Sequence, residues 1–432
     1  MPTAQKSFIG RIPLVWRILI GFVLGVTGGL LMQRFASPET VARVLPVTAP
    51  FGGVLVAMLK MVVYPIIFFS LVLGAASLPL RQSGKVGGTV VAWYALTSLF
   101  ATVLGVALAL ALNPSMAQPD TACAAHVGAA QAMAGRAQTD GTFAAFFIGL
   151  FVNPFEALAA GNFLPIIVFA ILFGVAARCL LDGDDAQAAG PVRSLLAACD
   201  GAQRISFKLI DWVMLYFPIG VFALTFTNFA KNGPLLFGPY MRIVLCVVTC
   251  VLAMIFVVYP AAIAVFRREN PFRVLARLRA PMLTGFVTRS SAATLPVSFR
   301  AMDEAGVPRA VSSFSLPLGA TVNMDGVCVH LPVFAILAAN MFGLELTAVQ
   351  LLTLVVSVMF ASIGAGGVPG GSVFLLFMVL ESMGLSPDQV AMIVALALGI
   401  NPILDMFETC CNVTGDNVCT YVVGAPRITN KQ

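Results

Sequence analysis

The chain has 432 residues, of which 59% are hydrophobic and only 10% are charged, and its mean hydropathy is +0.96. Soluble domains carry about 25% charged residues, so the composition excludes an ordinary soluble protein and indicates an all-α polytopic membrane protein. The net charge of +6 is small and its cations lie in loops, which gives a nucleic-acid partner no support. Nine cysteines without a CxxC pair and two histidines form no credible metal cluster.

Apolar runs predict the membrane helices in chain order. We expect helices near residues 12–35, 46–79, 87–113, 144–182, 203–230, 239–266, 309–343 and 388–424, the last two punctuated by polar residues. The runs 46–79 and 144–182 exceed the roughly 20 residues that one crossing needs, so they must tilt, break or continue beyond the bilayer. Gly161 and Pro165 are natural break points in the second run. Residues 114–143 are polar and predict an exposed loop.

The first apolar run and the loop charges indicate the orientation. Lys6, Arg11 and Arg17 precede the run, as in a cleaved signal peptide. Arg17 intrudes on the apolar stretch and no small-x-small site follows closely, so we expect a retained helix. Loops rich in Lys and Arg alternate with loops that carry only Arg136 and Lys231. The rich loops should be cytoplasmic, which places both termini on the cytoplasmic side of the plasma (inner) membrane.

Two segments do not have the composition of ordinary crossings. TRSSAAT at 288–294 and ASIGAGGVPGGS at 361–372 each lie between short apolar arms. Such runs cannot satisfy their backbone groups in lipid, so each predicts a re-entrant helical hairpin, the alternative being a Gly-rich loop between crossings. A polar-punctuated helix follows each hairpin. This repeated unit predicts a pair of inverted repeats of the kind that holds transporter sites.

The last of these helices carries polar groups along one face. The spacing of the five residues is 0, 3, 4, 7 and 11, which places them within an arc of roughly 100° and along about 16 Å of helix. Carboxylates inside a bilayer normally face a cavity, a partner or an ion path. The stripe therefore predicts a translocation site. Its residues are Asp405, Glu408, Thr409, Asn412 and Asp416.

Four motifs resemble those of the dicarboxylate/amino acid:cation symporter family. They are TRSSAATLPV (288–297), GATVNMDG (319–326), ASIGAGGVPGG (361–371) and LDMFETCCNVTGD (404–416). The resemblance implies eight transmembrane helices plus two re-entrant hairpins, a homotrimer, and a transport domain that moves like an elevator. The implied divisions are N-terminal helices with the sodium-site third helix (1–113), an exposed loop (114–143), the trimerisation scaffold with the remaining helices (144–266) and the transport core (267–432).

The family resemblance also implies three sodium sites built from oxygen atoms, which hard cations prefer. Asn323, Asn412, Asp416 and the Gly319 carbonyl correspond to the first site. The second site uses backbone carbonyls around Thr321, Met324, Ser362, Ile363 and Ala365. The third uses Tyr94, Thr97, Ser98, Asn323 and Asp325. Taken alone, a Thr or Ser on an apolar helix is more often a packing residue; the motif carboxylates favour the ligand interpretation.

The substrate pocket implied by the resemblance has a retained half and a changed half. Asp405 should bind the substrate amino group, while Ser291 and Asn412 bind the α-carboxylate. Thr409 and Val368 complete the expected pocket. Acidic amino acid carriers have an Arg and a Thr at two further positions, which are Glu408 and Val327 here. An anion thus replaces a bidentate cation, and an apolar side chain replaces a hydroxyl.

These residues predict a sodium-coupled amino acid symporter. An ionised Glu408 favours basic amino acids and repels aspartate and glutamate. Arg289 could pair with Asp405 or Glu408, or serve a purely structural role. If it neutralises Glu408, the pocket suits the runner-up, a neutral or small polar amino acid. His330 is either a proton-coupled group or a packed, hydrogen-bonded histidine. We also expect residues 364–371 to form an extracellular gate.

Two other function classes fit the sequence less well. An ion channel needs no amino-acid-binding pair such as Asp405 and Asn412. A membrane-embedded enzyme needs a nucleophile next to a base, and no such pair is evident in the sequence.

Overall fold

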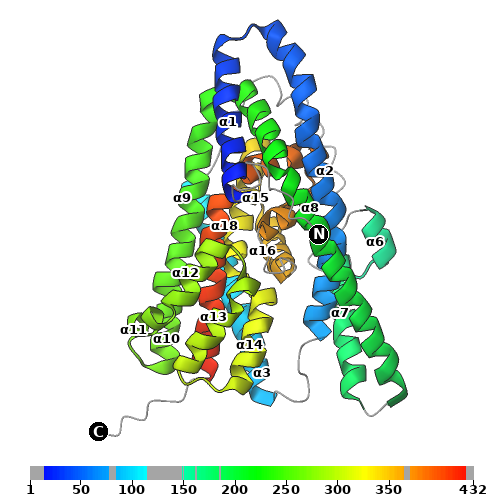
Figure 1. Ribbon diagram of the computed structural model, residues 1–432, viewed down its shortest axis with the longest axis vertical. Helices are drawn as coiled ribbons and strands as arrows, with labels where there is room; N and C mark the ends of the chain where they lie inside the picture. Colours follow the sequence, from blue (N-terminus) through cyan, green and yellow to red (C-terminus); the bar gives the residue numbers. More distant parts are fainter. Residues whose placement is uncertain are drawn as a thin grey trace, which may run out of the picture.

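The computed structural model describes residues 14–76, 84–113, 148, 150–160, 163–183, 186–363 and 370–424. All regular secondary structure in these ranges is helical (Figure 1). The elements are α1 (Leu14–Phe35), α2 (Pro38–Ala76), α3 (Gly84–Leu112), α6 (Pro154–Ala160), α7 (Phe163–Asp182), α8 (Ala186–Asn232), η2 (Gly233–Leu236), α9 (Phe237–Ala253), the π-helical η3 (Met254–Val258), α10 (Tyr259–Arg267), α11 (Pro271–Arg277), α12 (Arg279–Thr288), α13 (Ser291–Glu304), α14 (Arg309–Val322), α15 (Asp325–Phe342), α16 (Ala348–Ser362), α17 (Gly371–Ser382) and α18 (Pro387–Gly424).

The helices agree with the expected polytopic class. Within the described ranges, seven helical stretches are long and apolar enough to cross a membrane. Two helices are longer than expected, because α2 begins at Pro38 and α8 at Ala186. The added residues include Glu39 and Arg43 in α2 and Arg193 in α8, and these charged side chains lie outside the apolar runs from which the helices were predicted.

The expected break in the run 144–182 stays a prediction at Gly161. α6 ends at Ala160 and α7 begins at Phe163, and the two residues between them lie outside the described residues. Pro165 is in the first turn of α7, where its missing N–H removes no helical hydrogen bond. The expected loop 114–143 also lies outside the described residues.

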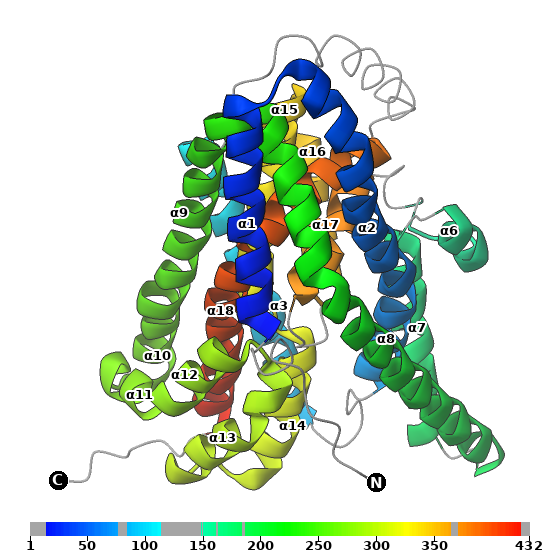
Figure 2. The same cartoon turned by 45° about the horizontal axis from the view of Figure 1, so that its top comes forward.

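The helices form two packed groups (Figures 1 and 2). In the first group, α1 and α2 pack on α8, and α2 also packs on α7. In the second group, α18 is central and contacts α12, α13, α14, α15 and α17. α3 packs on α15, while α9 contacts both α3 and α18. The polar stripe of α18 is therefore enclosed by protein.

The first expected hairpin is a helix–turn–helix formed by α12 and α13. Arg289 ends α12 in the left-handed conformation, with φ of 56°. Ser290 is extended, and its hydroxyl accepts a hydrogen bond from the Ala293 N–H at 3.2 Å, which caps α13. In the second hairpin, α16 and α17 form the arms, and residues 364–369 between them lie outside the described residues.

The polar motif at 319–326 interrupts what would otherwise be one helix. α14 ends at Val322, and α15 begins at Asp325. Asn323 has φ and ψ of −92° and 91°, and Met324 of −116° and 56°, so neither residue is helical. Carbonyl groups near the break lose their helical partners and can serve cations. This is the unwound segment that the motif implies.

Candidate transport site

Two buried carboxylates and an amide form the polar centre of the molecule. Asp325 begins α15, Asp416 lies on α18, and their side chains are 0% and 3% exposed. The Asn323 Nδ2 group donates to Asp416 Oδ1 at 3.0 Å. Its Oδ1 accepts from Thr97 Oγ1 at 3.3 Å. The break between α14 and α15 thus joins α3 to α18.

The expected ligands on α3 face this centre. Ser98 Oγ donates to Asp325 Oδ1 at 3.0 Å. Tyr94 Oη donates to the Ser315 carbonyl at 2.9 Å, so its proton is directed toward α14. The structure therefore brings Thr97 and Ser98 to the carboxylate cluster and places Tyr94 beside it.

Gly319 allows the helices to approach closely enough for this cluster. A Cβ atom at this position would lie 2.5 Å from Asp416 Oδ1 and 2.6 Å from Tyr94 Oη. Real Cβ atoms do not approach other atoms so closely. Only glycine therefore leaves room for α14 to present its backbone to these oxygens.

Asn412 contacts the broken segment rather than Asp416 directly. Its Oδ1 accepts from the Gly326 N–H at 2.7 Å, and its Nδ2 contacts Met324 Sδ at 3.3 Å. The side chain thus ties α18 to the first turn of α15. This position lies between the carboxylate cluster and Asp405.

The expected second sodium set is only partly visible. Thr321 Oγ1 donates to the Leu318 carbonyl at 2.9 Å, and Ser362 Oγ donates to the Met359 carbonyl at 2.8 Å. Both hydroxyls donate hydrogen bonds to carbonyl groups of their own helices. Backbone carbonyls therefore remain the expected sodium ligands. Ile363 follows the end of α16, and Ala365 lies outside the described residues. This grouping stays a prediction.

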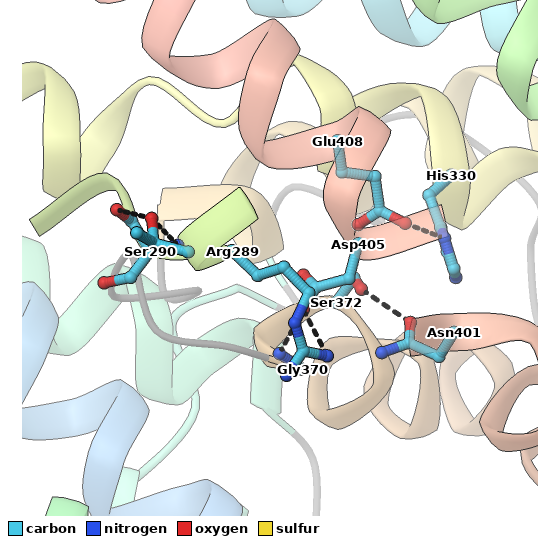
Figure 3. Close-up of polar contacts among 9 residues, drawn as sticks. Arg289, Ser290, His330, Gly370, Ser372, Asn401, Asp405 and Glu408 are labelled. Carbon is cyan, nitrogen blue, oxygen red and sulfur yellow. Dashed lines mark hydrogen bonds and ion pairs between the residues drawn. The ribbon is translucent and has the colours of Figure 1, made fainter. Parts of the chain in front are cut away.

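The two hairpins meet at Asp405 (Figure 3). Asp405 Oδ2 accepts a hydrogen bond from the Gly370 N–H at 3.0 Å, at the start of α17. The same oxygen lies 3.6 Å from Arg289 Nη1, at the tip of the first hairpin. Asp405 is 4% exposed. A carboxylate held by one cation and one N–H donor at this junction can exchange those contacts for a substrate ammonium group.

Glu408 pairs with a histidine, not with Arg289. His330 Nδ1 on α15 lies 2.5 Å from Glu408 Oε1, and the two side chains are 0% and 1% exposed (Figure 3). Among the described residues, His330 Nε2 and Glu408 Oε2 have no hydrogen-bond partner. The sequence left open whether Arg289 pairs with Asp405 or Glu408, and the structure assigns Arg289 to Asp405.

A family comparison agrees with this geometry. A model of the sodium:dicarboxylate symporter family matches residues 14–425. The chain belongs to this family. It is a multi-pass membrane transporter with Na⁺ as its coupling ion, and it is not an enzyme. Within the described residues, no three His, Cys, Asp or Glu side chains gather as a metal site, whereas Na⁺ uses the mixed oxygen ligands found here.

Curated relatives of the symporter differ in the substrates that their names state. The proton/sodium-glutamate symport protein of Bacillus caldotenax is 29% identical over 96% of this chain and 94% of the relative. A serine/threonine transporter of Bifidobacterium adolescentis is 31% identical, covering 93% and 87%. Neutral amino acid transporter B(0) of Bos taurus is 33% identical, covering 84% and 71%.

The structure describes three of the remaining expected substrate residues of the symporter. Ser291 is the first residue of α13, where free N–H groups and the helix dipole favour an anion. Thr409 and Val327 are both buried, on α18 and in the first turn of α15. Val368 lies outside the described residues, as does most of the expected gate at 364–371.

Sequence reasoning missed two functional contacts in the symporter. The Tyr259 hydroxyl donates to Asp325 Oδ2 at 2.7 Å, and His330 is the partner of Glu408. Tyr259 lies in a long apolar run, which hid its role. The available signal was chemical, because a buried phenol or imidazole needs a hydrogen-bond partner.

Proposed function

We propose that this symporter couples sodium entry to the transport of a neutral or small polar amino acid. The observation that carries the proposal is the division of roles along α18: Asp405 faces both hairpins, whereas the Glu408 side chain pairs with His330. Asp405 is suited to an α-ammonium group. The next polar side chain on that face is Glu408, whose carboxylate is already paired with His330 and is not free to bind a charged substrate.

The main-chain groups of an amino acid have suitable partners at this junction. Its ammonium group would replace the Arg289 and Gly370 contacts on Asp405. Its α-carboxylate would accept N–H groups at the start of α13, next to Ser291, and the amide of Asn412. The freed Arg289 guanidinium, two residues before Ser291, would be available to the same carboxylate.

The side-chain half of the pocket disfavours charged substrates. An acidic side chain would meet Glu408 and the apolar Val327, with no cation to receive it. The sequence-based prediction of basic amino acids assumed that Glu408 is ionised and has no partner. We infer that Glu408 and His330 form a neutral pair, either imidazolium with carboxylate or imidazole with carboxylic acid, which would not attract a cationic side chain. The names of the serine/threonine and neutral amino acid relatives support the same choice.

Sodium binding would organise the substrate site through the α14–α15 break. Na⁺ near Asp325 and Asp416 neutralises carboxylates that are costly to leave buried and unpaired. The broken segment also holds Asn412 through the Gly326 N–H. Ordering this segment would therefore position Asn412 for the substrate, which makes sodium and amino acid binding mutually favourable.

We further propose the elevator motion and homotrimer that the family resemblance implies. The first helix group would be the fixed scaffold, and α12–α18 with α3 would move. The separate packing of α1, α2, α7 and α8 against one another supports this division. The plasma (inner) membrane and cytoplasmic termini remain part of the same proposal.

Thermal stability of the purified protein tests the substrate proposal. Serine, alanine or threonine should raise the melting temperature in sodium buffer and leave it unchanged in choline buffer. Lysine, arginine, aspartate and glutamate should give smaller shifts in sodium. Equal stabilisation with and without sodium, or the largest shift with lysine or glutamate, would overturn the proposal.

A further inference from the structure

We propose that His330 is a specificity-determining residue, which acts through Glu408 to exclude cationic amino acids. The proposal deepens the function proposed above and rests on it. His330 does not itself have to touch the substrate. Its imidazole balances the charge of the Glu408 carboxylate on α18. The pocket therefore lacks the unpaired negative charge that a lysine or arginine side chain requires.

The pair is held in place by close packing of α15 on α18. A Cβ atom at Gly326 would collide with the backbone of Glu408, so the two helices are in backbone contact one turn before His330. The imidazole also stacks on Phe334, with ring centroids 4.7 Å apart. With both side chains buried, neither partner can replace the other with water.

Among the described residues, no ion pair joins another cation to Glu408. Arg289, at the tip of the first hairpin, lies on Asp405 instead. The other titratable groups near the pair are Asp405 one turn earlier on α18, Cys411 one turn later, and Asp325 and Cys328 on α15. The two aspartates are acidic and would only increase the need for a proton at this pair. His330 is therefore the group that can share a proton with Glu408.

The shared proton explains the exclusion of cationic side chains. A buried carboxylate without a partner either takes up a proton or attracts a cation. Under this assignment the pair holds one proton in addition to the N–H of a neutral imidazole, so that it is either an imidazolium with a carboxylate or an imidazole with a carboxylic acid, and both forms are neutral overall. A lysine ammonium group could use Glu408 only if the pair released its proton. Without the histidine, Glu408 would lack its partner, and a lysine ammonium group could take that place.

The test compares single and double variants in proteoliposomes. His330→Gln keeps an amide that can donate to Glu408 but cannot carry the proton. The measured quantity is the lysine inhibition constant divided by the KM for sodium-driven serine uptake. We expect this ratio to fall by about tenfold or more in His330→Gln. His330→Gln/Glu408→Gln, which restores a neutral pair, should return the ratio toward the wild-type value.

A purely structural role for His330 predicts a different pattern. Loss of packing would change the constants for both amino acids, and the second substitution would not restore their ratio. An unchanged ratio in His330→Gln, or a ratio that stays low in the double variant, would overturn the inference.

The wild-type protein provides a second test that does not depend on folding of a variant. Since lysine must displace one proton, its inhibition constant should fall as pH rises from about 6 to about 9, by up to about tenfold per pH unit. The KM for serine should change much less. Parallel pH profiles for lysine and serine would contradict the role of His330. Failure of sodium-driven uptake for every neutral amino acid would instead contradict the proposed function.

Discussion

Asp325 and Asp416 are buried carboxylates whose neutral neighbours cannot balance two negative charges. Asn323, Ser98 and Tyr259 donate hydrogen bonds to them, but hydrogen bonds do not remove net charge. Removing the partner of a buried charge typically costs about 3–5 kcal/mol. Sodium is therefore expected to stabilise the folded centre as well as drive transport.

Asp325→Asn and Asp416→Asn should each abolish sodium-driven uptake and weaken sodium affinity by at least about a hundredfold, because each removes one compensating charge. Sodium-dependent thermal stabilisation measures the affinity. Asp303→Asn is the matched control, since Asp303 forms an exposed pair with Arg309 at 3.2 Å and should change uptake by less than about twofold. Full uptake by the Asp325 and Asp416 variants without sodium would refute this assignment.

Glu408→Arg with Val327→Thr should shift substrate preference toward aspartate and glutamate. The arginine would supply a bidentate cation, and the threonine a hydroxyl donor, for the acidic side chain. The shift is expected to exceed about a hundredfold in relative affinity, measured by competition of labelled uptake. Val327→Thr alone is the control and should leave the preference for neutral substrates in place. If the wild type already prefers glutamate, the role given to Glu408 is wrong.

The sequence predicted which residues belong to the site better than it predicted which side chains they contact. Asp405, Asn412 and Asp416 share one helix face, so helical spacing alone places them together. His330 and Glu408 meet across two helices that are far apart in the chain, as do Tyr259 and Asp325. Such contacts depend on tertiary packing, which residue spacing does not encode.

At the scale of the elements, the α14–α15 break brings the sodium-site groups of α3 and α18 together. Gly319→Ala should weaken sodium affinity by about tenfold or more, because the added methyl group would meet Asp416 and Tyr94 at 2.5 and 2.6 Å. The affinity can be measured from sodium-dependent thermal shifts.

Gly201→Ala in α8 is the matched control for Gly319→Ala. No atom lies within 4 Å of a Cβ built at Gly201, so the methyl group should be tolerated and should favour the helix slightly. Sodium affinity should stay at the wild-type value. Equal effects of the two substitutions would mean that close packing at Gly319 does not shape the site.

Element boundaries were predictable where a chemical signal marked them. Asn323 and the adjacent polar motif marked the break between α14 and α15. The early starts of α2 and α8 were not predicted, because charged residues such as Glu39, Arg43 and Arg193 precede the apolar runs.

At the scale of the whole molecule, large apolar side chains are exposed on the first helix group. They include Val47 and Phe51 on α2 and Ile205, Trp212 and Leu215 on α8. A surface of this kind must face lipid or another copy of the chain. The elevator proposal requires a scaffold that stays fixed, and contacts between scaffolds of three copies would supply one.

Native mass spectrometry in detergent tests this assembly. We expect the dominant species to have three times the mass of the 45.4 kDa chain. Trp212→Glu on α8 should reduce that species if α8 contributes to the interface, and Trp212→Leu is the control. A wild-type protein that is monomeric in several mild detergents would contradict the trimer.

Sodium-driven uptake in proteoliposomes tests the central claim most directly. Labelled serine should accumulate above equilibrium only with an inward sodium gradient, and unlabelled alanine, serine and threonine should compete more strongly than lysine, arginine, aspartate or glutamate. Serine accumulation that does not depend on the sodium gradient would contradict the account. So would stronger competition by a charged amino acid than by alanine, serine or threonine.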